Sequence, residues 1–162
     1  METNNKLIET LNDLLKINND RIAGYEKAAD EASRMDIDLQ GIFSKMADES
    51  RRHAAELKQE IRKLGGEPAN GTTNSGKVYR LWMDIKASFS GKDRHAILEA
   101  CEFGEDAAQK AYIEAINTGF ENNGDVLKLI KAQQAELKIG HNLIKKYRDL
   151  NKATTKSNIN SL

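Results

Sequence analysis

Three glutamates and two histidines have the side-chain types and the spacing of metal ligands. Glu26, Glu49 and Glu105 each stand beside an apolar stripe near the middle of a long helical pattern, and two histidines lie within such stripes. An ionised carboxylate facing an apolar core is costly to desolvate unless a positive group meets it. Carboxylates and imidazoles together suit iron and manganese. The candidate metal ligands are therefore Glu26, Glu49, His53, Glu105 and His141.

The same residues also have a simpler interpretation. Charged residues make up 31% of the chain, so several glutamates are expected at the edge of a helical stripe. Each would then pair with a neighbouring Lys or Arg and remain accessible to water. His53 would be a histidine at the edge of the core, with its hydrogen bonds satisfied. Both interpretations stay open at the level of the sequence.

Apolar residues recur at three- and four-residue steps over long segments, which predicts an all-α protein. The predicted helices cover residues of about 5–34, 38–64, 77–89, 93–119 and 125–151. The pair Gly65-Gly66 is expected to end the second helix, because glycine commonly follows a helix end. Residues 1–151 therefore form one domain, and residues 152–162 are expected to be a flexible polar tail.

The connection between the second and third long helices is far longer than a turn between neighbouring helices requires. It spans residues 65–92 and includes the short helix at 77–89. A single long crossover of this kind is typical of ferritin-like four-helix bundles, and an up-down bundle with a decorated loop explains the length less well. In the crossover topology Glu26, Glu49, Glu105 and His141 fall within roughly 5 Å of one level, at a rise of about 1.5 Å per residue.

Composition excludes several classes of function. Lys+Arg and Asp+Glu both number 25, so no charge bias indicates nucleic acid or an anionic membrane. Cys101 is the single cysteine, and no apolar run approaches the roughly 20 residues of a membrane span. The N-terminus has no signal-peptide pattern, and no phosphate-binding or dinucleotide-binding motif is present. These observations together predict a cytoplasmic protein.

Several short motifs carry a resemblance to a known family. They are Gly24-Tyr25 with Ala28-Ala29, Leu64-Gly65-Gly66-Glu67-Pro68, Trp82-Met83-Asp84-Ile85-Lys86, Cys101-Glu102-Phe103-Gly104-Glu105-Asp106-Ala107 with Tyr112, and Ala135-Glu136-Leu137-Lys138 with His141. Over most of residues 5–150 the chain resembles bacterial ferritin-like four-helix-bundle proteins of uncharacterised function. The resemblance implies the ferritin-like fold and supplies no activity, substrate or metal.

The pattern departs from that of di-iron ferritins in two places. Their helices carry Glu-x-x-His, whereas this chain has Glu49-x-x-x-His53. Glu136 is expected to point away from His141, so the last helix offers no paired carboxylate. The hydroxyls of Tyr25 and Tyr112 could reach the site, although packing is the commoner role of such aromatic residues.

Two functions remain open. The first is binding of iron or manganese in the handling of iron, oxygen or peroxide under stress, with no catalytic residue assigned. The second is a non-catalytic, stress-associated bundle that acts as an interaction or assembly module without bound metal. Trp82 on the crossover helix is a candidate contact for a homodimer.

Overall fold

A computed structural model describes residues 2–32, 37–72, 94–118 and 123–160 of the chain. These residues form four long helices and no strand: α1 (Glu2–Ala32), α2 (Ile37–Lys63), α4 (Arg94–Thr118) and α5 (Gly124–Asn160). The prediction of an all-α four-helix bundle is confirmed. The predicted crossover helix at 77–89 lies outside the described residues. No helix in the described ranges is both long and apolar enough to cross a membrane.

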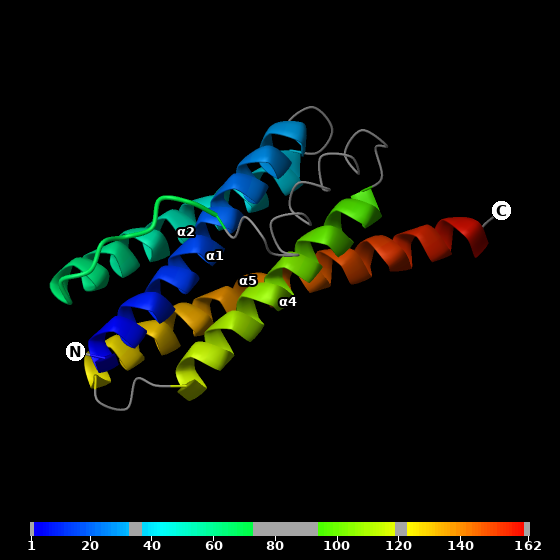
Figure 1. The fold of residues 1–162 in the computed structure, drawn as a ribbon. Coiled ribbons are helices and arrows are strands. Elements are labelled where there is room, and N and C mark those ends of the chain that lie inside the picture. Colours follow the sequence, from blue (N-terminus) through cyan, green and yellow to red (C-terminus); the bar gives the residue numbers. More distant parts are fainter. Residues whose placement is uncertain (1, 33–36, 73–93, 119–122, 161–162) are drawn as a thin grey trace.

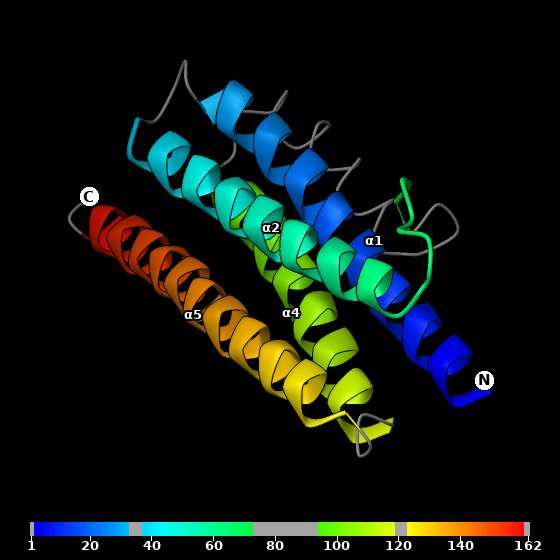
Figure 2. The same ribbon diagram turned by 90° about the vertical axis from the view of Figure 1, so that its left-hand side faces the viewer.

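The bundle consists of two antiparallel helix pairs, α1 with α2 and α4 with α5 (Figure 1). Both views show α2 and α4 starting at the same end of the bundle and running in the same direction (Figure 2). This parallel arrangement is the one that a single long crossover produces. It brings the middle of each helix to the centre of the bundle.

Local sequence signals define the end of α2 and the start of α5. Gly65 has a φ of 84°, and the Gly65 and Gly66 amides donate to the carbonyls of Arg62 and Ile61 at 3.0 and 2.9 Å. This is the Schellman pattern, in which a left-handed glycine satisfies carbonyl groups of the last turn. At the start of α5, the Asn123 side chain accepts a bond from the Val126 amide at 3.2 Å, as an N-cap does.

The structure differs from the sequence prediction at the C-terminus. The prediction ended the last helix near 151 and made residues 152–162 a flexible tail, whereas α5 continues to Asn160. The polar composition of this stretch suggested a tail, but it contains neither glycine nor proline. Without either residue, nothing in the local sequence forces the helix to stop.

The apolar core is divided into two clusters. One contains Tyr25, Phe43 and Leu98, together with alanines of α1, and the other contains Leu11, Leu57 and neighbouring residues. Side chains that are buried and polar are also present, and they come from all four helices: Asn18, Asp20, Arg21, Ser50, His53, Glu105 and Gln133. Hydrogen bonds of several of these residues link the helices inside the bundle.

Candidate functional site

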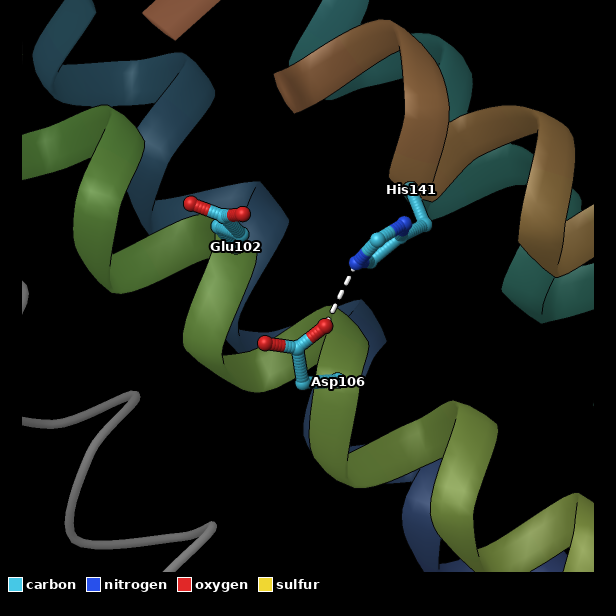
Figure 3. A group of neighbouring side chains, drawn as sticks. All are labelled: Glu102, Asp106 and His141. Atoms are coloured by element: carbon cyan, nitrogen blue, oxygen red, sulfur yellow. Dashed lines mark hydrogen bonds and ion pairs between the residues drawn. The ribbon is translucent and has the colours of Figure 1, made fainter.

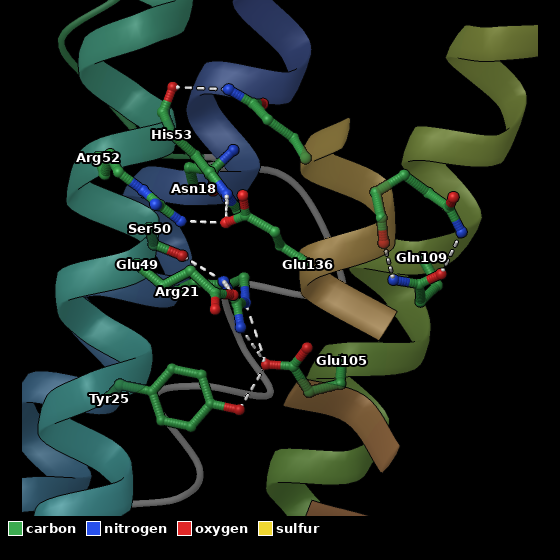
Figure 4. Close-up of polar contacts among 12 residues, drawn as sticks. Asn18, Arg21, Tyr25, Glu49, Ser50, Arg52, His53, Glu105, Gln109 and Glu136 are labelled. Atoms are coloured by element: carbon green, nitrogen blue, oxygen red, sulfur yellow. Dashed lines mark hydrogen bonds and ion pairs between the residues drawn. The ribbon is translucent and has the colours of Figure 1, made fainter. Parts of the chain in front are cut away.

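A buried arginine occupies the centre of the bundle. The side chain of Arg21 on α1 is 1% exposed, and its Nη2 lies 2.5 Å from Oε1 of Glu105 on α4. Its Nε donates to the same oxygen at 3.0 Å, while its Nη1 donates to the hydroxyl of Ser50 on α2 (Figure 4). The guanidinium therefore links α1 to α2 and to α4. It supplies the positive charge that the buried carboxylate requires.

Arg21 was not among the predicted site residues, although the helical spacing contains a signal for it. Strict alternation of four- and three-residue steps along α1 runs through Leu14, Asn18, Arg21, Tyr25 and Ala28. All five of these side chains are buried. An apolar stripe that steps from Asn18 to Ile22 and then to Tyr25 is also possible from the sequence, but Ile22 is only partly buried. The hydrophobicity of Ile22 and the rarity of buried arginine concealed this register.

Glu105 receives all its donors on one oxygen. Besides the two guanidinium bonds, the hydroxyl of Tyr25 donates to Oε1 at 2.5 Å. The side chain is fully buried, and its Oε2 has no hydrogen-bond partner among the described residues. Burial raises the pKa of Tyr25 well above its ordinary value, and the charge of Glu105 raises it further. Tyr25 therefore remains a neutral donor.

Arg21 remains charged despite its burial. Burial by itself lowers the pKa of the guanidinium, but Glu105, Tyr25 and Glu49 together outweigh it, and the net direction is upward. The ring of Tyr25 lies below the guanidinium, with 5.3 Å between Cζ and the ring centroid. A fixed cation of this kind can orient a carboxylate and a phenol, but it has no lone pair to offer a metal.

Glu49 lies at the edge of this network. Its Oε1 is 3.9 Å from Nη1 of Arg21, and this oxygen has no hydrogen-bond partner among the described residues. Burial raises the pKa of Glu49, while the charge of Arg21 acts in the opposite direction. The carboxylate is therefore incompletely compensated, and its neutral form is favoured more than in water.

His53 pairs with a glutamate that the sequence analysis had considered only in relation to His141. Its Nε2 lies 3.1 Å from Oε2 of Glu136 on α5, and Arg52 donates to the same oxygen. The other ring nitrogen, Nδ1, is buried and has no partner among the described residues. Burial lowers the pKa of His53, although Glu136 acts to raise it. The neutral imidazole is therefore favoured.

A second series of hydrogen bonds extends from α1 to α5. Together with the contacts of Arg21, these bonds form a central polar layer. Asn18 donates to the hydroxyl of Tyr112 at 2.8 Å, and that hydroxyl donates to Oε1 of Gln133 at 2.8 Å. The Gln133 amide then donates to the backbone carbonyl of His53 at 3.3 Å. The Tyr112 hydroxyl thus reaches into the layer, as does that of Tyr25. This series of hydrogen bonds connects all four helices through neutral groups.

The structure does not bring the five predicted ligands into one cluster. Glu49, His53 and Glu105 lie in the central polar layer. Each has a charged side chain beside it, which is Arg21 for the two glutamates and Glu136 for His53. Glu26 is 53% exposed and pairs with Arg51 of α2, as the alternative interpretation expected. His141 lies instead between α4 and α5, where its Nε2 is 2.5 Å from Oδ1 of Asp106.

Comparison with known proteins agrees with this architecture. Residues 6–118 match a protein family described as a domain of unknown function, DUF2383. No curated protein matches the chain. Among solved structures, the chain is similar to a Desulfovibrio desulfuricans bacterioferritin whose di-iron site was studied in different catalytic states. The sequence identity is 26% and the TM-score 0.69, over 94% of this chain and 88% of that one. The ferritin-like fold is therefore confirmed.

Proposed function

Since the chain belongs to the DUF2383 family, whose function is itself unknown, we propose that it is a ferritin-like bundle without a metal centre at its core, where Arg21 and Glu105 meet. In this proposal the protein is a non-catalytic module for interaction or assembly. The observation that carries it is the guanidinium of Arg21, which lies against Glu105 in the interior of the bundle.

Electrostatic repulsion disfavours a metal ion beside Arg21. A divalent ion bound to Glu105 would have to share the bundle centre with a permanently charged guanidinium, and like charges in a poorly solvated interior repel strongly. The ion would also compete with the three donors that Oε1 of Glu105 accepts. Arg21 thus neutralises the carboxylate as a metal ion would, but it provides no open coordination position.

The proposal also includes the cellular location, the role and the assembly of the protein. We place the protein in the cytoplasm, in a stress-associated role, with a homodimer as the simplest assembly. Support comes from the ferritin-like fold, the balanced charge of 25 basic and 25 acidic residues, and the single cysteine, which is buried. Sedimentation velocity over a wide concentration range tests the assembly. A protein that stays monomeric throughout would contradict the homodimer.

A second candidate is the handling of iron or manganese at the bundle centre. It is supported by the similarity to a bacterioferritin with a di-iron site, and by buried atoms without partners among the described residues. These atoms are Oε1 of Glu49, Nδ1 of His53 and Oε2 of Glu105. Arg21 would have to leave the centre before an ion could enter. Glu26 and His141 would have to turn inward to complete the set of five metal ligands predicted from the sequence.

One experiment separates the two candidates. Tag-free protein purified without chelator is analysed by elemental mass spectrometry, before and after anaerobic addition of Fe(II). The wild type and the variants Glu49→Gln and Glu105→Gln should then contain the same amount of iron and manganese, since the centre holds neither ion. A stoichiometric metal that the wild type binds and Glu105→Gln loses would overturn the proposal and establish the second candidate.

A further inference from the structure

A second group of ligand-type side chains lies between α4 and α5, away from the Arg21 network. It consists of Glu102 and Asp106 on α4 and His141 on α5 (Figure 3). Each residue offers one ligand atom, and these atoms lie within 4.8 Å of one another. Among the described residues it is the one group of three or more acidic, histidine or cysteine side chains that meets this distance.

The helical geometry explains why these side chains meet. Glu102 and Asp106 are four residues apart, so their carboxylates lie on the same face of α4. That face is turned toward α5, the antiparallel neighbour that carries His141. The position is partly open to solvent: His141 is 18% exposed and Asp106 63%. An ion could therefore enter and keep water on its remaining coordination positions.

The charges around the group leave it negative. Arg148 on α5 pairs with Oε2 of Glu102 and compensates one carboxylate. Unlike Arg21, the Arg148 side chain is partly exposed, at 24%, so water screens its charge from an ion at this position. Asp106 has His141 as its partner, with 2.5 Å between the two atoms. The approach is attractive either when Nε2 carries the ring proton and donates it to the carboxylate, or when a cation lies between the two atoms. Nδ1 of His141 lies 3.4 Å from Oδ1 of Asn142, an arrangement that would hold Nε2 toward the carboxylates.

We propose that Glu102, Asp106 and His141 bind a single divalent transition-metal ion, which bridges α4 and α5. One imidazole nitrogen and two carboxylate oxygens suit Mn²⁺, Fe²⁺ or Zn²⁺, with water completing the coordination. The ion replaces the proton between Asp106 and His141, and small rotations of these partly exposed side chains open the required space. This site does not depend on the proposed function, because it shares no ligand with the Arg21 network.

The test is calorimetric titration of the full chain with MnCl₂ and, separately, ZnCl₂, at neutral pH. We expect one ion per chain, with affinity reduced by about tenfold or more in Asp106→Asn and His141→Ala. Glu49→Gln and Glu26→Gln serve as controls and should bind as the wild type does. The first changes the bundle centre, and the second removes another exposed carboxylate that was a predicted ligand.

Thermal unfolding gives an independent measurement, since an ion that binds the folded chain raises its melting temperature with concentration. This rise should be absent in Asp106→Asn and His141→Ala, even if both are fully folded without metal. The proposal is overturned if millimolar metal gives no binding, or if the two variants bind as well as the wild type. Binding that Glu49→Gln loses and Asp106→Asn keeps would also overturn it, and would place the ion at the bundle centre.

Discussion

The guanidinium of Arg21 and the carboxylate of Glu105 form an ion pair in which both side chains are at most 1% exposed. They lie 84 residues apart in the chain, on helices of different antiparallel pairs. An ion pair of this kind gains little over an apolar pair of similar volume, but removal of one partner is expensive. It therefore fixes how the α1–α2 pair meets the α4–α5 pair.

Replacement of Arg21 should destabilise the protein strongly. In Arg21→Met the Glu105 carboxylate loses its cation while it remains buried, which costs about 3–5 kcal/mol for pairs of this type. Chemical denaturation at neutral pH measures the loss. The double variant Arg21→Met, Glu105→Gln should recover a large part of it, because the fully buried charge of Glu105 is removed together with its partner. A double variant no more stable than Arg21→Met would contradict this account.

Arg51 offers a matched control for this prediction. It pairs with Glu26 between α1 and α2, but its side chain is 45% exposed. Exposed ion pairs contribute about 0–1 kcal/mol, so Arg51→Met should have a free energy of unfolding close to that of the wild type. An equal loss in Arg21→Met and Arg51→Met would show that burial is not the cause.

Removal of the Tyr25 hydroxyl should cost about 1.5–3 kcal/mol, the range for hydrogen bonds to charged groups. Tyr25→Phe keeps the packing of the ring against Phe43, at 5.8 Å between centroids, and removes the donor to Glu105. Denaturation of Tyr25→Phe beside Tyr147→Phe measures the effect, because Tyr147 packs only at the edge of the apolar core. Similar stabilities for the two variants would refute the contribution of this bond.

Glu49→Gln should stabilise the protein at neutral pH. Burial raises the pKa of Glu49 above the ordinary value of 4.5, so the folded state binds the proton more tightly than the unfolded state. The contribution of Glu49 to stability is therefore complete below about pH 4.5 and is lost as the pH rises through the raised pKa. The glutamine variant lacks this loss.

The measurement is the melting temperature of both proteins from pH 4 to pH 8. The wild type and Glu49→Gln should have similar melting temperatures near pH 4, and the variant should melt at a higher temperature at neutral pH. A gain of 1 kcal/mol corresponds to about 2–4 °C for a chain of this size. A variant that melts lower than the wild type at neutral pH would show that the contact of Glu49 with Arg21 outweighs the cost of burial.

Two glycines should respond oppositely to alanine. Gly65 has a φ of 84°, where an alanine side chain is strained, so Gly65→Ala should destabilise by about 1–2 kcal/mol. Gly41 is exposed inside α2, and an added Cβ there meets nothing within 4 Å. Gly41→Ala should stabilise by about 0.5–1 kcal/mol, because alanine favours the helix. Thermal unfolding of both variants measures the two changes in stability. Changes of the same sign would contradict the prediction.

Much of the fold was predictable because its signals are local. The helix end at Gly65-Gly66 and the turn before α5 depend on residues close together in the chain. The long connection after α2 predicted the parallel course of α2 and α4, since chain length limits topology. The predicted end of α5 was wrong, because polar composition alone is a weak indicator of where a helix stops.

The candidate site was predicted only in part, because a helical stripe covers a wide angle. Glu26, Glu49, Glu105 and His141 were expected near one level. Of these, Glu49 and Glu105 lie in the central layer, together with His53. Arg21 and Ile22 are consecutive residues whose side chains point about 100° apart on α1, and local sequence does not decide which of them points to the centre. His141 was expected to face inward, but it contacts Asp106 between α4 and α5.

The sequence by itself determined the helices, their order and the level at which polar residues meet, since periodicity and chain length are properties of single segments. Tertiary structure decided the rotation of each helix about its axis. That rotation turned Arg21 toward Glu105 and turned Glu26 toward Arg51. The identity of the cation that compensates Glu105 depends on this packing of separate helices, and no single segment of the chain encodes it.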